Sequence, residues 1–153
     1  MKTVHTWERF SFTVQAPIDE AAPLFGAYKE RAWAPNFDPK FIYPFPAQDT
    51  QGMVFTVSHG ERKAYWVNTE FDVKNGRIRY SYVIPEIMAT ALFINLTPDG
   101  ETTRVDVTYE RTSLSVEGNA RVQQFSAGDR VAGSEWQKQI NRYLDRPKAS
   151  HHA

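Results

Sequence analysis

Apolar and polar residues alternate near the N-terminus and again through the middle of the chain. In residues 4–14, Val4, Phe10, Phe12 and Val14 share one side, and mainly polar residues occupy the other. This period of two is typical of a strand with one buried face. Similar segments, separated by short turns, predict further strands at 41–45, 53–59, 64–72, 77–84, 90–96 and 103–113. The short connections favour antiparallel pairing.

Helical spacing occurs in two other parts of the chain. Between the first two strands, Asp19 is a predicted N-cap for a helix over 20–25, and Gly26 separates it from a second short helix over 27–33. After the last strand, a long amphipathic helix is predicted from Gly118 to Arg146. Its apolar face carries Val122, Phe125, Trp136, Ile140 and Tyr143.

A long amphipathic helix needs a broad apolar surface to cover, and the alternating strands supply one. The predicted fold is therefore α+β: a helix-grip fold in which a curved seven-stranded antiparallel sheet wraps around the C-terminal helix. Two short helices lie between strands 1 and 2. We expect one domain over residues 1–147 and a disordered tail over 148–153.

Composition and charge narrow the function classes. Eighteen basic and eighteen acidic residues cancel without clustering, which argues against nucleic acid as a partner. No apolar run is long enough to span a membrane, and the charged N-terminus does not resemble a signal peptide, so we expect a cytoplasmic protein. Without cysteine there are no disulfides. His151 and His152 form either a metal-binding pair or a terminal remnant; we favour the remnant and expect no metal or cofactor.

Aromatic residues make up 14% of the chain, more than a small core needs and suited to the lining of an apolar pocket. We expect a small apolar ligand between the sheet and the C-terminal helix. The predicted ligand-binding residues are Trp33, Phe55, His59, Tyr80, Tyr82, Tyr109, Asp129 and Trp136.

Four of these candidates have a simpler structural interpretation. Asp129 lies in the centre of the helical stripe; it either binds a ligand hydroxyl or moves a proton, or it is an N-cap after Gly128 or a paired core acid. His59 shares a face with Phe55 and is either the inner acid/base group or a strand end near solvent. The hydroxyl of Tyr80, like that of Tyr82, either orients a ligand or bonds to backbone in the core.

For two further residues the sequence leaves two interpretations open. Arg111 either holds a carboxylate or phosphate at the rim of the cavity or, more simply, makes a surface ion pair with Glu110 or Glu117. By periodicity Trp66 faces outward, which suggests a homodimer surface, unless a β-bulge turns it inward.

The order of elements resembles the START-like or Bet v 1-like (SRPBCC) superfamily, including the bacterial polyketide cyclase/dehydrase-like proteins. Matching segments are Ala16-Pro17, Trp33-Ala34-Pro35, Trp66-Val67, Phe71-Asp72, the approach from Thr112 to Asn119, and Glu135-Trp136 to Tyr143-Leu144. The resemblance covers essentially the whole chain. It implies a deep cavity that binds lipids, sterols, polyketides or other apolar molecules, with catalysis in only some members.

No phosphate loop, metal-binding histidine pair or nucleophile elbow is present in the sequence. The first hypothesis is therefore a binding protein for a small apolar, lipid-, polyketide- or aromatic-like molecule. The second is a cyclase or aromatase in which Asp129 or His59 transfers protons. The third is a protein-binding module resembling chaperone activators, for which Trp66 and Trp7 are the only candidates for an exposed apolar patch.

Overall fold

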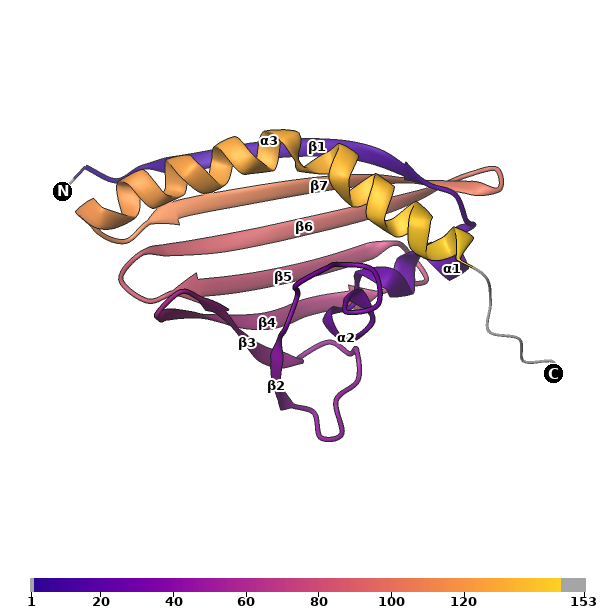
Figure 1. Ribbon diagram of the computed structural model, residues 1–153, viewed down its shortest axis with the longest axis horizontal. Helices are drawn as coiled ribbons and strands as arrows, with labels where there is room; N and C mark the ends of the chain where they lie inside the picture. Colours follow the sequence, from indigo (N-terminus) through magenta and orange to yellow (C-terminus); the bar gives the residue numbers. More distant parts are fainter. Residues whose placement is uncertain (1, 147–153) are drawn as a thin grey trace.

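One antiparallel sheet of seven strands and one long helix dominate the computed structural model, which describes residues 2–146 (Figure 1). The strands are β1 (His5–Val14), β2 (Lys40–Tyr43), β3 (Val54–His59), β4 (Arg62–Asp72), β5 (Arg77–Ile84), β6 (Met88–Asp99) and β7 (Thr102–Ser113). The helices are α1 (Ile18–Ala21), the 3-10 turn η1 (Ala22–Phe25), α2 (Ala27–Glu30) and α3 (Val116–Asp145). The predicted helix-grip fold is confirmed. The predicted tail, with His151 and His152, lies outside the described residues.

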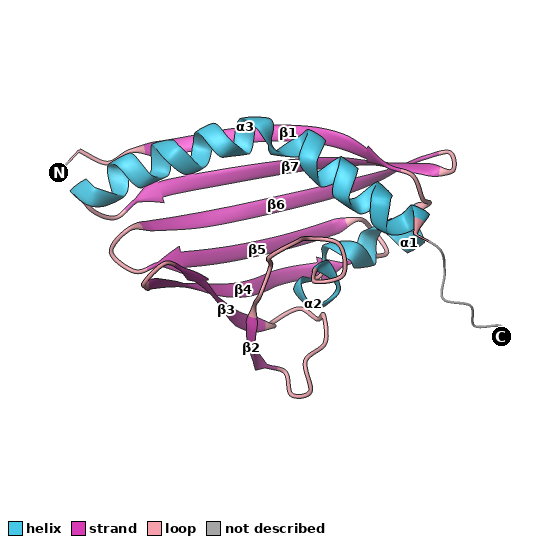
Figure 2. Cartoon of the chain, viewed as in Figure 1, coloured by secondary structure: helices cyan, strands magenta, loops and turns pink. Residues whose placement is uncertain are grey.

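The strand order is β1-β7-β6-β5-β4-β3-β2, so nearly every strand pairs with its neighbour in sequence. Alternation places the residues on the faces of the sheet as expected: in β5, Ile78, Tyr80, Tyr82 and Ile84 are all buried. The helix α3 lies over β1 and β7, while α1 and α2 sit at the end of the sheet where α3 finishes (Figures 1 and 2). The helix α3 therefore does not cover the inner face of β3 to β5.

Trp66 faces inward, so of the two placements left open by the sequence, outward by simple periodicity or inward through a β-bulge, the second holds. It pairs directly with Phe55 and Tyr82, which are both buried, and its ring stacks on each of them. The register of β4 shifts between Asn68 and Glu70. This bulge moves the buried face from the even to the odd positions, so Trp66 and Phe71 both point inward although they are five residues apart. The homodimer surface suggested for Trp66 therefore does not exist, and of the two tryptophans proposed for a protein-binding patch only Trp7 is exposed.

The helix α3 is continuous over 30 residues. It begins two residues earlier than predicted because the Ser115 side chain accepts a hydrogen bond from the Gly118 backbone N–H and caps the first turn. Gly128 does not interrupt it, so Asp129 is not an N-cap. Among the helices that the structure describes, none has the length and apolar character required to cross a membrane.

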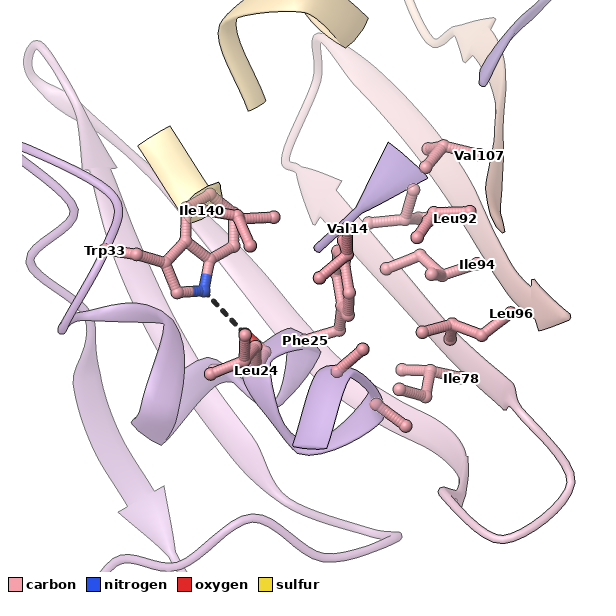
Figure 3. Close-up of a cluster of buried hydrophobic side chains, with 14 of the residues drawn as sticks. Val14, Leu24, Phe25, Trp33, Ile78, Leu92, Ile94, Leu96, Val107 and Ile140 are labelled. Carbon is pink, nitrogen blue, oxygen red and sulfur yellow. Dashed lines mark hydrogen bonds between the residues drawn. The ribbon is translucent and has the colours of Figure 1, made fainter. Parts of the chain in front are cut away.

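Buried side chains form two clusters. The larger one fills the end of the molecule that α1 and α2 close, and its members include Val14, Phe25, Trp33, Ile94 and Ile140 (Figure 3). The smaller one lies around Tyr82, Ile84, Met88 and Val122. Trp66 packs against both clusters, and the space beside it is not filled by the core.

Candidate functional site

A cavity of about 590 Å³ opens between α3 and the inner face of the sheet beside Trp66. Its walls are mainly aromatic, formed by Phe37, Trp66, Tyr82, Tyr109, Phe125 and Trp136. The exposed positions Gln124 and Gly128 of α3 lie on its lining and mark its open side. A second hollow of about 580 Å³ lies at the molecular surface beside α1 and the end of α3, where charged residues such as Asp19 and Asp145 line it. Its charged lining makes it a poor pocket for an apolar molecule.

The main cavity continues inward to a small hollow of about 40 Å³. Phe55, Tyr80 and Leu92 line this hollow but not the main cavity. Five residues line both spaces: Glu30, Phe37, Trp66, Tyr109 and Trp136. They mark the inner end of the cavity.

Arg111 and Asp129 form a buried ion pair on the cavity wall. The Arg111 Nε and Nη2 atoms each lie 2.8 Å from one oxygen of Asp129, and only 3% and 8% of the two side chains are exposed. Arg111 also donates to the hydroxyl oxygens of Tyr82 and Thr90. Burial alone would lower the pKa of Arg111, but the hydrogen bonds and charge of Asp129 outweigh it and raise the pKa. Arg111 is therefore a buried partner of Asp129, and the expected surface pair with Glu110 or Glu117 was wrong.

This pair leaves little free bonding capacity for a ligand. Both oxygens of Asp129 are taken by Arg111 in a two-point contact. The guanidinium plane lies against the rings of Tyr109 and Phe125, with its central carbon 4.4 and 4.8 Å from their centroids. The paired-acid interpretation of Asp129 is the one that the structure supports.

Glu30, which the sequence analysis did not single out, is the unpaired acid of the cavity. It is the last residue of α2, and its partly exposed side chain lines the inner end of the cavity. Burial and the nearby Asp49 carboxylate raise the pKa of Glu30 to about 8. A signal was available, because Glu30 shares its helical face with Ala27 and Ala34 and so places an acid on an otherwise apolar face.

The position of Glu30 depends on a contact between α2 and the loop before β3. Asp49 accepts hydrogen bonds from the backbone N–H groups of Tyr28 and Lys29, at 2.7 and 3.0 Å. A Cβ atom on Gly26 would lie 2.1 Å from the Asp49 carboxyl carbon, so only glycine leaves room for this contact. Asp49 thus both holds α2 against the sheet and supplies the negative charge that acts on Glu30.

His59, at the end of β3, lines the cavity as its strand alternation predicted. Its ring meets Phe125 edge to face, with centroids 5.9 Å apart. Burial, with the positive charges of Arg121 and Arg111, lowers the pKa of His59 below its usual value near 6.5. His59 is therefore uncharged at neutral pH.

The other predicted site residues divide into three groups. Tyr82, Tyr109, Asp129 and Trp136 line the main cavity with His59, whereas Phe55 and Tyr80 line only the inner hollow. The Tyr80 hydroxyl donates to the Phe25 carbonyl oxygen at 2.7 Å, the backbone contact that was the simpler interpretation. Trp33 lines neither space; its indole N–H donates to the Leu24 carbonyl oxygen and its ring packs on Phe25 and Trp136 (Figure 3).

Comparison with known proteins shows likeness in structure but not in sequence. No family model matches the chain, and no curated protein sequence matches it. Among solved structures, norcoclaurine synthase from Thalictrum flavum superposes with a TM-score of 0.69 at 12% identity, covering 97% of this chain and 98% of that one. Mll3558 from Rhizobium loti gives 0.67 at 20% identity, covering 94% of this chain and all of the other. The chain therefore shares its fold with these proteins.

A third neighbour is larger than this chain. DynU16, a protein of the dynemicin biosynthetic locus, gives a TM-score of 0.57 at 20% identity, and the match covers 90% of this chain but 46% of DynU16. The resemblance expected from the element order is therefore confirmed at the level of the fold. At these identities the likeness assigns no ligand or activity to this chain.

Proposed function

We propose that this protein binds a small planar aromatic molecule in the cavity between α3 and the sheet. The observation that carries the proposal is the cavity wall, in which six aromatic rings surround about 590 Å³. Ligand pockets in proteins usually measure roughly 300–1,000 Å³ and have apolar walls with a few polar groups. Flat aromatic walls favour flat ligands, because offset stacking and edge contacts add to the gain from burial.

Polar groups at both ends of the cavity support a ligand with polar substituents rather than a pure hydrocarbon. Glu30 lies at the inner end, and Arg121, Gln124 and His59 contribute polar groups elsewhere on the lining. The neighbours are consistent with this chemistry, since one norcoclaurine synthase structure contains dopamine and hydroxybenzaldehyde, both aromatic molecules.

The alternative of a cyclase that transfers protons through Asp129 has less support. Both oxygens of Asp129 are held by Arg111, and proton transfer requires a free acid or base within reach of the reacting group. The pair of groups expected for this reaction, Asp129 and His59, is therefore not available, because Asp129 is already held by Arg111. Binding is therefore the function that the geometry supports best.

The test is to fill the cavity from its open side. Gly128 lines the cavity, and a Cβ atom there has no neighbour within 4 Å, so Gly128→Phe introduces a large side chain on the lining at a position with room for its Cβ atom. We expect wild-type protein to bind the neutral probe naphthylethanol in calorimetry, and the variant to bind it at least about tenfold more weakly.

Ala127→Phe is the matched control, because residue 127 is exposed on the same helix and does not line the cavity. This variant should bind naphthylethanol like the wild type. Equal loss in both variants, or no binding of neutral aromatic probes by the wild type, would count against the proposed function.

A further inference from the structure

Among the described residues 2–146, the carboxyl group of Glu30 has no partner at the inner end of an aromatic cavity. We propose that the ligand carries a protonated amine and that Glu30 binds its nitrogen, so that the cavity takes aromatic amines in preference to neutral aromatic compounds. This inference rests on the proposed function, because the contact requires a ligand in the cavity.

The first argument is that Glu30 lacks a partner of its own. Within residues 2–146, no side chain or backbone N–H donates a hydrogen bond to its carboxyl group and no cation forms an ion pair with it. A mostly buried acid without a partner is costly to ionise, so such groups are usually paired. An ammonium group on the ligand would supply the missing charge and the hydrogen-bond donors together.

The second argument is the surroundings of Glu30. Phe37, Trp66, Tyr109 and Trp136 line the cavity and its inner hollow together with Glu30. The faces of aromatic rings attract a nearby cation, most strongly those of tryptophan. A carboxylate among aromatic rings is thus a suitable environment for an organic cation and a poor one for an anion.

The third argument is the balance of charge on the elements around Glu30. The titratable and charged groups on these elements are acids, bases and phenols. The acids are Asp49 near α2 and Asp129 on α3. The bases are Lys29 and Arg31 near α2, His59 on β3, Arg111 on β7 and Arg121 on α3, and the phenols are Tyr80 on β5 and Tyr109 on β7. Arg111 is neutralised by Asp129, and His59 is uncharged at neutral pH. Lys29 and Arg31 act on Asp49, and no cation figures among the causes that shift the pKa of Glu30. Glu30 therefore has a second acid, Asp49, near it and no paired cation among the described residues.

Binding of an ammonium group by this site is coupled to proton release. In the free protein the pKa of Glu30 is about 8, so the group is mostly protonated at pH 7. An alkylammonium ion binds the carboxylate form of Glu30. On binding, the carboxylic acid of Glu30 therefore releases its proton to the buffer, and the ammonium group of the ligand stays protonated. The amine affinity should therefore rise with pH, by up to about tenfold per pH unit below pH 8, until the amine itself loses its proton.

The experiment compares two probes that differ only in one group, naphthylethylamine and naphthylethanol, by calorimetry with the wild-type protein. At pH 8 we expect the amine to bind about tenfold or more tightly than the alcohol, as a charge-assisted hydrogen bond allows. At pH 7, titrations in phosphate and in Tris should show release of close to one proton per amine bound and none for the alcohol. In Glu30→Gln the ratio of amine to alcohol affinity should fall to near one, whereas the control Glu101→Gln, in an exposed turn, should keep the wild-type ratio.

The outcomes separate this inference from the proposed function. If the wild type binds the alcohol as tightly as the amine, or releases no proton with the amine, the amine assignment is wrong while the binding function stands. Tighter binding of the alcohol at pH 6 than at pH 8 would instead make Glu30 a hydrogen-bond donor to a neutral ligand, which also overturns the inference. If neither probe binds, the proposed function itself fails.

Discussion

Glu30 and Asp129 line the same cavity but differ in what they can do. Asp129 is held by two hydrogen bonds from Arg111 and serves as the partner of a buried cation. Glu30 has no such partner in the part of the chain that the structure describes, and burial together with Asp49 raises its pKa to about 8. A paired acid is part of the structure, whereas an unpaired acid in a cavity has its charge available for a ligand.

Replacement of Glu30 should stabilise the protein, and the effect should depend on pH. The folded-state pKa of about 8 lies above the usual value of 4.5, so the folded protein binds this proton more tightly than the unfolded chain. This contribution to stability is fully present below pH 4.5 and is lost as the pH rises to about 8. We therefore expect Glu30→Gln to raise the free energy of unfolding by about 2–4 kcal/mol at pH 9 and by little at pH 4.

Urea unfolding at the two pH values measures this difference, and Glu101→Gln serves as the control for a change of net charge. An equal effect of Glu30→Gln at both pH values would show that the carboxyl group titrates normally. It would also remove the proton coupling predicted for amine binding.

Asp129 should be replaceable only together with its partner. Asp129→Ala leaves the buried guanidinium of Arg111 without a counter-charge, and we expect a loss of about 3–5 kcal/mol of unfolding free energy. Arg111→Met in the same chain removes the isolated charge but leaves the hydroxyls of Tyr82 and Thr90 without their donor. The double variant should lie within about 2 kcal/mol of the wild type.

A double-mutant cycle measured by chemical unfolding gives the coupling energy between the two residues. Additive losses, with the double variant less stable than either single one, would mean that the two side chains do not form a buried pair.

At the scale of elements, two of the three glycines of α3, Gly118 and Gly128, lie in opposite surroundings. At Gly118 a Cβ atom would lie 2.0 Å from the Ile87 carbonyl oxygen, where the first turn of the helix meets the connection between β5 and β6. At Gly128 a Cβ atom would meet nothing within 4 Å. The first glycine allows two elements to touch, and the second only lowers the helical propensity of the segment beside the cavity.

The same substitution should therefore have opposite effects at these two positions. Gly118→Ala should lower the free energy of unfolding by about 2–3 kcal/mol, because the backbone must move apart. Gly128→Ala should raise it by about 0.5–1 kcal/mol, because alanine favours the helix. Urea unfolding of both variants tests the docking of α3, and stabilisation by alanine at both positions would contradict the close contact at Ile87.

The α2 element illustrates how a short helix is held in place by the rest of the fold. A single helical turn of four residues is not stable by itself. Its position comes from Asp49, which lies 21 residues beyond Tyr28 in sequence and bonds to the helix backbone. The location of Glu30 thus depends on a loop whose sequence contains no regular pattern.

At the scale of the whole molecule, the cavity exists because α3 covers only part of the sheet. The helix lies over β1 and β7 (Figure 1). Beside it, aromatic side chains from several elements and Glu30 of α2 line the space over the inner face of the sheet. One wall comes from α3 and the others from strands far away in sequence. A pocket of this kind is a property of the assembled layers and of no single segment.

Hydrophobic periodicity in the sequence determined the seven antiparallel strands, the continuous buried face of β5 and the long amphipathic helix. These features were accessible because alternation and helical spacing are local properties of the chain. For His59 it left two placements open, the inner face or a strand end near solvent, and in the structure the residue is both the end of β3 and part of the cavity lining. Only the tertiary structure decided the side of Trp66, since the bulge at Asn68 depends on the pairing of β4 with β5. The pairing of Arg111 with Asp129 and the unpaired state of Glu30 likewise arise where separate elements meet, and the charge and chemistry of a buried group depend on which neighbours surround it.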